Sequence, residues 1–318
     1  MIKKGKIPVL LAPMAGVTDL PFRNVVSKFG VDMVFSEMIA DHSVLSRDVK
    51  NQKIELGTSF SNTAVQLAGC EPEAMGEAAK IISDLGARAI DINMGCPAKK
   101  VVGGYSGSAL MRDLKKASAI IDSVVKAVDV PVSLKARLGW DDNTKNAKEL
   151  GQLAEKCGVQ LFTIHARTRN QFYKGFADWN AILEVKREIK IPVIANGDIV
   201  DIRSAGQALK LSGSDGLMMG RGVVGKPWLI SQISACVNKE PQPSSPKGLS
   251  LLELILEHYD EILSFYGEPL GVRIARKHLK RYLDIFGLSK RLSTDFLKEN
   301  SAKEVIRKLF EIPNRVNL

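Results

Sequence analysis

A cysteine stands at the end of an apolar run, where its thiol could transfer a proton. Residues Asp91–Lys100 read DINMGCPAKK, so a buried-strand pattern ends in a tight turn around Cys96. Glycine permits the turn and proline fixes the backbone after it, which displays the thiol at a strand end. The Asn93 amide precedes it, and the cations Lys99 and Lys100 follow. We therefore expect Cys96 to be a catalytic acid for an anionic, polar substrate. The alternative is a cysteine packed away in a loop.

Polar residues also gather at the ends of other apolar runs in the chain. They are Gln66, Lys135, Arg137, His165, Arg167, Asn196, Asp198 and Arg221. Asn196–Asp198 and Met219–Gly222 add glycines, which allow close backbone approach, and a fixed cation, as in a phosphate site. Donors at Lys135 and His165, with the Gln66 amide, suit a flat, electron-rich ring. The combination predicts FMN. The alternative is a sugar phosphate, with Lys135 as an aldolase Schiff-base lysine.

Eight short apolar runs must position these residues. They are Val9–Gly16, Met33–Met38, Thr63–Gly69, Ala89–Gly95, Pro131–Gly139, Leu161–Thr168, Ile191–Asp198 and Gly216–Gly222. The stretches of helical spacing between them include Glu71–Leu85, Ala109–Val128, Lys145–Cys157, Trp179–Ile189 and Ile202–Leu211. The runs are mostly continuous, as in parallel strands covered on both faces, and eight β–α alternations predict a (β/α)8 TIM barrel.

An open, doubly wound sheet is the alternative to the barrel. Such a sheet usually carries a GxGxxG after its first strand, whereas here the sequence is Pro13-Met14-Ala15-Gly16. In a barrel, the polar residues listed above would meet at the C-terminal ends of the strands, where barrel enzymes have their active sites. The connection Ile39–Asn62 is long and shows no clean helix, so it fits the barrel pattern least well.

Three parts follow one another along the chain. Residues 1–238 form the predicted barrel, and residues 239–248, KEPQPSSPKG, are predicted to be a linker. Residues 249–318 show helical spacing over Leu249–Phe265, Val272–Phe286 and Ala302–Phe310. This helical part is too short to fold around a large core of its own, so we expect it to dock against the barrel.

The composition is that of a globular protein, with 45% hydrophobic and 25% charged residues among 318. Four separated cysteines without a CxxC pair argue against a metal site or a disulfide framework and favour a reducing compartment. Because no run has the length of a signal sequence or a membrane span, we expect a soluble, cytoplasmic protein. The net charge of +10 favours a polyanionic partner.

Seven segments together resemble the tRNA-dihydrouridine synthases, most closely their bacterial B-type subgroup. They are Ala12–Asp19, Asp91–Lys100, Lys135–Gly139, Ile164–Arg169, Pro192–Ile199, Met219–Gly222 and Arg273–His278, and they span nearly the whole chain. The resemblance implies an enzyme that reduces uridine to 5,6-dihydrouridine in tRNA, with FMN as cofactor and NADPH as reductant. It also implies that Cys96 protonates C5 of uracil while reduced flavin delivers hydride to C6.

The resemblance further implies a set of binding residues. Those expected to bind FMN are Pro13, Met14, Ala15, Gln66, Lys135, His165, Asn196, Gly197, Asp198, Gly220 and Arg221. Separately from the resemblance, we expect Asn93, Lys99, Arg137, Arg167 and Arg169 to contact the RNA near the active site. Together with Lys174, Phe172 and Tyr173, the residues Arg167 and Arg169 follow the sixth run as one group that could grip or stack an exposed nucleotide.

The helical part carries its basic residues in one cluster: Arg273, Arg276, Lys277 and Lys280. Arg273, Lys277 and Lys280 share a helical face, and we expect this stripe to contact tRNA phosphates. An ordinary solvated face is the alternative.

Two other functions fit parts of the sequence. One is a flavin-dependent reductase or lyase of a small free metabolite, and the other is an RNA-binding protein without activity. The helical part disfavours the first, and the set Cys96, Lys135 and His165 disfavours the second. No metal and no obligatory protein partner are predicted.

Overall fold

Eight parallel strands close into a barrel in the computed structural model, which describes residues 5–46 and 62–316. The strands are β1 (Val9–Leu11), β2 (Met33–Phe35), β4 (Thr63–Ala68), β5 (Ile90–Met94), β6 (Val132–Arg137), β7 (Leu161–His165), β8 (Val193–Asn196) and β9 (Gly216–Met219). Each of these strands pairs with the next one along the chain, including β2 with β4. The pairing of the last strand, β9, with the first, β1, closes the ring. The predicted TIM barrel is thus confirmed, and the open sheet is excluded.

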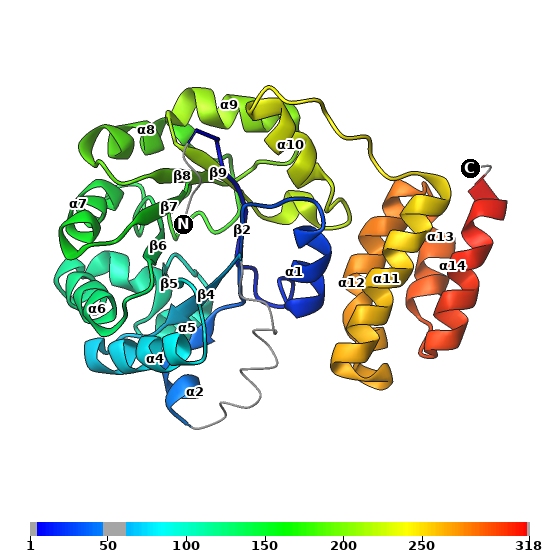
Figure 1. The fold of residues 1–318 in the computed structure, drawn as a ribbon, viewed down its shortest axis with the longest axis horizontal. Helices are drawn as coiled ribbons and strands as arrows, with labels where there is room; N and C mark the ends of the chain where they lie inside the picture. Colours follow the sequence, from blue (N-terminus) through cyan, green and yellow to red (C-terminus); the bar gives the residue numbers. More distant parts are fainter. Residues whose placement is uncertain (1–4, 47–61, 317–318) are drawn as a thin grey trace.

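Helices surround the barrel (Figure 1). They are α1 (Leu20–Ser27), α2 (Asp41–Leu45), α4 (Pro72–Asp84), α5 (Lys99–Gly103), α6 (Leu114–Ala127), α7 (Ala147–Cys157), α8 (Trp179–Glu188), α9 (Ile202–Ser212) and α10 (Leu229–Val237). The predicted helix 109–128 is in fact two elements, because Asp113 accepts a hydrogen bond from Lys116 N (3.0 Å) and begins α6. A 3-10 helix, Gly107–Arg112, precedes it. In the long second connection, the strand β3 (Ile39–Ala40) and α2 come first, and residues 47–61 lie outside the described part.

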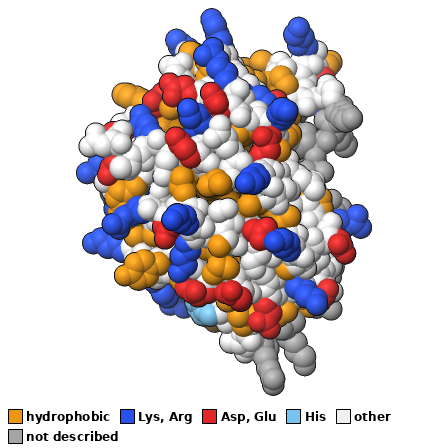
Figure 2. Space-filling view, turned by 90° about the vertical axis from the view of Figure 1, so that its left-hand side faces the viewer, with side chains coloured by type: hydrophobic (Ala, Val, Ile, Leu, Met, Phe, Trp, Pro, Cys, Tyr) orange, Lys and Arg blue, Asp and Glu red, His pale blue; other side chains and the backbone are white. Residues whose placement is uncertain are grey.

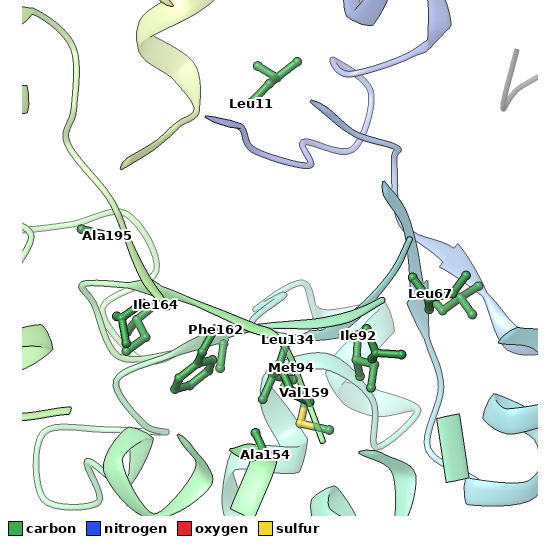
Figure 3. Packing of buried hydrophobic residues seen from close by; sticks show 14 of the residues in the cluster. Leu11, Leu67, Ile92, Met94, Leu134, Ala154, Val159, Phe162, Ile164 and Ala195 are labelled. Carbon is green, nitrogen blue, oxygen red and sulfur yellow. The ribbon is translucent and has the colours of Figure 1, made fainter. Parts of the chain in front are cut away.

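Side chains alternate between the two faces of the barrel wall. Outward residues pack against the helices, and Figure 3 shows members of this layer, including Leu67, Ile92, Leu134 and Phe162. The inward positions fall into two zones. Apolar side chains fill the lower interior, among them Leu10, Phe35, Leu161, Ile194 and Met218. Polar side chains take the inward positions nearer the C-terminal ends: Gln66, Asp91, Asn93, Lys135, His165 and Asn196. The barrel therefore brings the polar strand ends together.

Four further helices form a bundle, and α11 packs against α1 (Figure 1). They are α11 (Gly248–Tyr266), α12 (Glu268–Ile285), α13 (Lys290–Leu297) and α14 (Ala302–Val316), and residues 239–247 lead into them without helix or strand. Their apolar cluster also contains Val25 of α1 and Trp228, so the predicted docking on the barrel is confirmed. The sequence did not predict α13, a short polar helix that buries only Phe296. In the part of the chain that is described, no helix has the length and apolarity to cross a bilayer.

Candidate active site

Hydrogen bonds hold the turn of Cys96 on both sides. Asn93 Oδ1 accepts from Gly95 N (3.1 Å) and Cys96 N (2.9 Å). Ser108 donates to Cys96 O through its hydroxyl (2.8 Å) and its backbone N–H (3.1 Å). Gly107 has φ +59°, and a Cβ there would lie 2.9 Å from Cys96 O, so a side chain would disturb the turn. The half-buried thiol is thus fixed at the end of β5, as the sequence predicts.

A chain of buried hydrogen bonds lies below this turn. Asn93 Nδ2 donates to Gln66 Oε1 (2.7 Å), and Gln66 Nε2 donates to Asp91 Oδ2 (2.6 Å). The other carboxylate oxygen of Asp91 accepts from Ser133 Oγ (2.6 Å). Asp91 is fully buried, and burial raises the pKa of its carboxyl to about 6. Sequence reasoning gave Asp91 no role, although an acidic residue two positions before Asn93 must face the same side of the strand.

Lys135 and Asn196 meet across the barrel mouth. Lys135 Nζ donates to Asn196 Oδ1 (3.1 Å), and Asn196 Nδ2 donates to Met218 O (2.8 Å). Burial, with a smaller contribution from Arg137, lowers the pKa of Lys135 to about 8. The ammonium group is therefore charged at neutral pH but close to its titration range. The amide of Asn196 fixes its position.

His165 presents a buried ring nitrogen at the same mouth. Its Nε2 has no hydrogen-bond partner among the residues that the structure describes, and the side chain is 9% exposed. Burial, reinforced by the nearby cations, holds the pKa of His165 well below its usual value, so the ring is neutral. Gly197 makes room for it, because a Cβ at that position would lie 2.9 Å from His165 Cδ2. An unpaired buried nitrogen of this kind is suited to a ligand.

The two glycine turns after β8 and β9 lie against each other. A Cβ on Gly222 would lie 2.6 Å from Ile199 O, so the turns contact through their backbones. Gly197 (φ +115°) and Asp198 (φ +53°) both have left-handed backbones. The Asp198 carboxylate is used within the protein, because it accepts from Arg167 and from Ala177 N (2.8 Å). Any phosphate contact here would therefore come from backbone N–H groups and the exposed Arg221.

Two of the predicted RNA contacts are buried. Arg137 is 1% exposed and Arg167 is 2% exposed. Arg137 donates to Gly95 O, Thr168 O and Phe172 O, each at 2.8 Å. Arg167 donates to the carbonyls of residues 174 and 175 as well as to Asp198. Both guanidinium groups therefore brace the loop 168–176 from below. Their contact with RNA stays a prediction, and it would have to take place beneath this loop.

The exposed rim of the mouth carries aromatic and cationic side chains. Tyr105, Tyr173 and Phe176 are 75%, 54% and 91% exposed. The Arg169 guanidinium stacks on Trp140 and on Phe172, at 4.5 and 4.9 Å from the ring centroids. The sequence pointed to Tyr173 and Arg169, but the exposure of Tyr105 and Phe176 depends on loop conformation. The predicted contact Lys99 is exposed at the start of α5.

The basic stripe of α12 separates into two pairs. Arg273 and Lys280 are exposed. Arg276 Nη2 donates to Glu299 O (2.9 Å) and Asn300 Oδ1 (2.7 Å), which ties α12 to the loop before α14. Lys277 donates to Gly16 O of the barrel. On the face over α6, α7 and α8, away from the helical part, Lys and Arg alternate with Asp and Glu (Figure 2). That view offers no continuous basic patch.

A parallel (β/α)8 barrel with convergent polar groups at its C-terminal mouth has the architecture of a barrel enzyme. The chain belongs to the dihydrouridine synthase family, whose model, "Dihydrouridine synthase (Dus)", matches residues 10–313. It is 52% identical over 288 residues to "Probable tRNA-dihydrouridine synthase" of Rickettsia conorii, covering 89% of this chain and 87% of that one. It is 42% identical over 275 residues to "tRNA-dihydrouridine synthase B" of Xanthomonas campestris, covering 86% and 83%.

The fold has a counterpart among solved structures. A histamine dehydrogenase from Rhizobium sp. 4-9 superposes with a TM-score of 0.54 at 11% sequence identity, over 79% of this chain and 48% of that one. At such low identity the likeness concerns the barrel architecture alone. Family membership makes the chain an enzyme, and the substrate and cofactor have to be argued from its own site.

Proposed function

We propose that this protein is a flavin-dependent tRNA-dihydrouridine synthase that reduces uridine to 5,6-dihydrouridine in tRNA. The observation that carries the proposal is the thiol of Cys96, fixed by Asn93 and Ser108 at a mouth of buried hydrogen-bond donors. The names of the relatives support tRNA as the substrate, and two of them are of the B type. A cytoplasmic location suits this substrate and the four free cysteines.

The residues of the mouth fit FMN. The unpaired Nε2 of His165 and the ammonium of Lys135 offer polar contacts to a flat heterocycle. The turns at Gly197 and Gly220 offer close backbone approach for a phosphate, and Arg221 adds a cation. Gln66 has a second N–H beyond the one donated to Asp91. Pro13, Met14 and Ala15 lie beside these turns at the end of β1. The chemistry that bound flavin supplies, once reduced by NADPH, is a hydride for C6 of uracil.

Cys96 completes the reduction by giving its proton to C5. One hydride and one proton add across the C5–C6 double bond, and the thiolate left on Cys96 regains a proton from solvent. The ammonium group of Lys135 lies at the same mouth and carries the opposite charge to this thiolate. Asn93 and Ser108 hold the backbone of the turn that carries this thiol.

The rim supplies the contacts that a folded RNA requires. Uracil must leave its stack to enter the mouth, and a flipped base is held by aromatic and cationic side chains. Tyr105, Tyr173 and Phe176 are exposed around the mouth, with Arg169 and Lys99 among the cations. A reductase of a small free metabolite would have no use for so exposed a set.

The test uses the purified protein, NADPH and two substrates, an unmodified tRNA transcript and free uridine monophosphate. Mass spectrometry of the digested RNA should detect dihydrouridine, and uridine monophosphate should remain unchanged. The absorbance spectrum of the ligand released by heat should be that of FMN. Equal reduction of free nucleotide would replace this proposal by the metabolite reductase. A protein that neither contains nor binds FMN would exclude both functions.

A further inference from the structure

Asp91 begins a directional chain of hydrogen bonds that ends at the reactive turn. The chain passes from the carboxylate to Gln66, from Gln66 to Asn93, and from Asn93 to the N–H groups of Gly95 and Cys96. We propose that Asp91 is a positioning residue, which sets the orientation of both amides and so places the Cys96 thiol for proton transfer. This inference rests on the proposed function and extends it to a residue that touches neither substrate nor cofactor.

The direction of the chain is fixed at its upper end. The backbone N–H groups of Gly95 and Cys96 can only donate, so the side chain of Asn93 must turn its oxygen toward them. Its NH₂ group then faces Gln66 and must find an acceptor there. Gln66 has to present its oxygen to Asn93, which leaves its own NH₂ group pointing at residue 91.

The lower end must therefore be an acceptor, and an ionised carboxylate can be nothing else. Asp91 accepts on both oxygens, from Gln66 on one and from Ser133 on the other. An amide at this position would have two orientations. One keeps an oxygen toward Gln66. The other turns an NH₂ group toward Gln66 and accepts from Ser133, so the amides above must either lose a hydrogen bond or reverse, which would set the Asn93 NH₂ group against the N–H groups of Gly95 and Cys96. A carboxylate removes this conflict, because it can only accept and so agrees with the direction that the backbone N–H groups require.

Burial makes the chain effective. Asp91 and Gln66 are 0% and 1% exposed, and Asn93 is 8% exposed, so water cannot readily replace a lost partner. A charge buried in such a place is unfavourable for stability, so we expect a functional role of the carboxylate. The positioning of Cys96 is that role.

The experiment compares Asp91→Asn with a matched control, Ser133→Ala. The control removes the other donor to Asp91 but leaves the chain to Cys96 intact. With prereduced flavin and tRNA transcript, Asp91→Asn should slow uridine reduction about tenfold without changing tRNA affinity. Ser133→Ala should stay within about twofold of wild type. Reduction of bound flavin by NADPH should be unchanged in Ser133→Ala, and it is measured separately in Asp91→Asn because Gln66 is also a proposed FMN contact.

A double variant distinguishes positioning from a general effect of the substitution. In the Cys96→Ala background, Asp91→Asn should cause no additional loss, because the group that it positions is absent. An equal loss in that background, an equal loss in Ser133→Ala, or a wild-type rate for Asp91→Asn would each overturn the proposal.

A second readout does not depend on the catalysed reaction. The rate at which iodoacetamide alkylates Cys96, followed by peptide mapping, should change in Asp91→Asn and not in Ser133→Ala. Identical rates in all three proteins would contradict the positioning role. If the wild-type protein forms no dihydrouridine in tRNA, the proposed function fails, while the alkylation rates still decide whether Asp91 controls the turn.

Discussion

Arg167 holds the Asp198 carboxylate through both of its oxygens, at 2.9 and 2.6 Å. This bidentate pair joins the loop that follows β7 to the glycine turn that follows β8. Arg167 is 2% exposed and Asp198 28% exposed, so the pair is largely shielded from water. It connects two parts of the mouth that have different proposed partners, because loop 168–176 belongs to the RNA rim and the glycine turn to the phosphate site.

Breaking this pair should therefore weaken FMN binding without removing any group that touches the phosphate. In Arg167→Gln, Asp198 loses its charged partner, and the loss of such charge-assisted hydrogen bonds typically costs about 1.5–3 kcal/mol. We expect a lower melting temperature and faster FMN release, both partly restored by adding Asp198→Asn. Arg169→Gln is the control and should leave FMN release unchanged, because this half-buried arginine of the same loop contacts Trp140 and Phe172 rather than Asp198. Equal FMN release from Arg167→Gln and wild type would show that the pair does not support the phosphate turn.

Arg221 should act on the cofactor directly. It is exposed at the end of β9, with its guanidinium 4.8 Å from the ring centroid of Tyr173. A charge-assisted contact to phosphate contributes roughly 1.5–3 kcal/mol, so Arg221→Ala should raise the Kd for FMN about tenfold to a hundredfold. Fluorescence titration of the apoprotein with FMN and with riboflavin separates the phosphate contribution, because riboflavin affinity should not change. A parallel loss for both ligands would place Arg221 against the ring instead.

Removing the thiol should affect only one half of the reaction. Cys96→Ala should slow uridine reduction by about 10²–10⁴, the usual loss for one general acid. Flavin reduction by NADPH and the affinity for tRNA should remain at wild-type values. Rapid-mixing absorbance follows the two halves separately. A wild-type rate of uridine reduction would leave Cys96 with a structural role only.

The sequence predicted the barrel and most of its mouth because both depend on local patterns. Apolar runs that alternate with amphipathic stretches define the strands, and polar residues such as Lys135 and His165 end them. The positions of Arg137 and Arg167 could not be predicted in the same way. The sequence does not distinguish an arginine at a strand end that faces solvent from one that lies beneath a loop. Here the carbonyl oxygens of loop 168–176 accept hydrogen bonds from both guanidinium groups and keep them buried.

Asp91 was missed for a related reason. An acidic residue inside an apolar run reads as an interruption of the strand until its partners are known, and those partners come from β4 and β6. The sequence also could not predict that the basic stripe of α12 separates into two exposed residues and two residues with partners in the protein. Arg276 and Lys277 are neighbours in one basic cluster, but the loop before α14 and the turn between β1 and α1 provide acceptors for them.

The buried carboxylate of Asp91 should give stability a measurable pH dependence. Its pKa of about 6 in the folded protein lies above the usual 3.8, so between these values the folded state binds more protons than the unfolded chain. Stability therefore falls as the pH rises from about 4 to 6, by about 3 kcal/mol from this group. The asparagine side chain in Asp91→Asn does not titrate, so the variant should not show this decrease in stability. Relative to wild type, it should gain melting temperature between pH 4 and pH 7.5. A constant difference across that range would mean that the carboxylate is not desolvated.

The two pairs of the α12 stripe should behave differently when their charges are removed. Arg273 and Lys280 are exposed, and if they contact phosphates, each change to glutamine should lower the salt slope of tRNA binding by about one. The melting temperatures of Arg273→Gln and Lys280→Gln should equal that of wild type, because glutamine keeps helix propensity. Arg276→Gln and Lys277→Gln remove contacts to Glu299 and Gly16 instead, so they should lower the melting temperature. The measurements are tRNA affinity at several salt concentrations and thermal unfolding of each variant. Wild-type slopes for both Arg273→Gln and Lys280→Gln would make the stripe a solvated face and leave the RNA-binding cations at Lys99, Arg169 and Lys174.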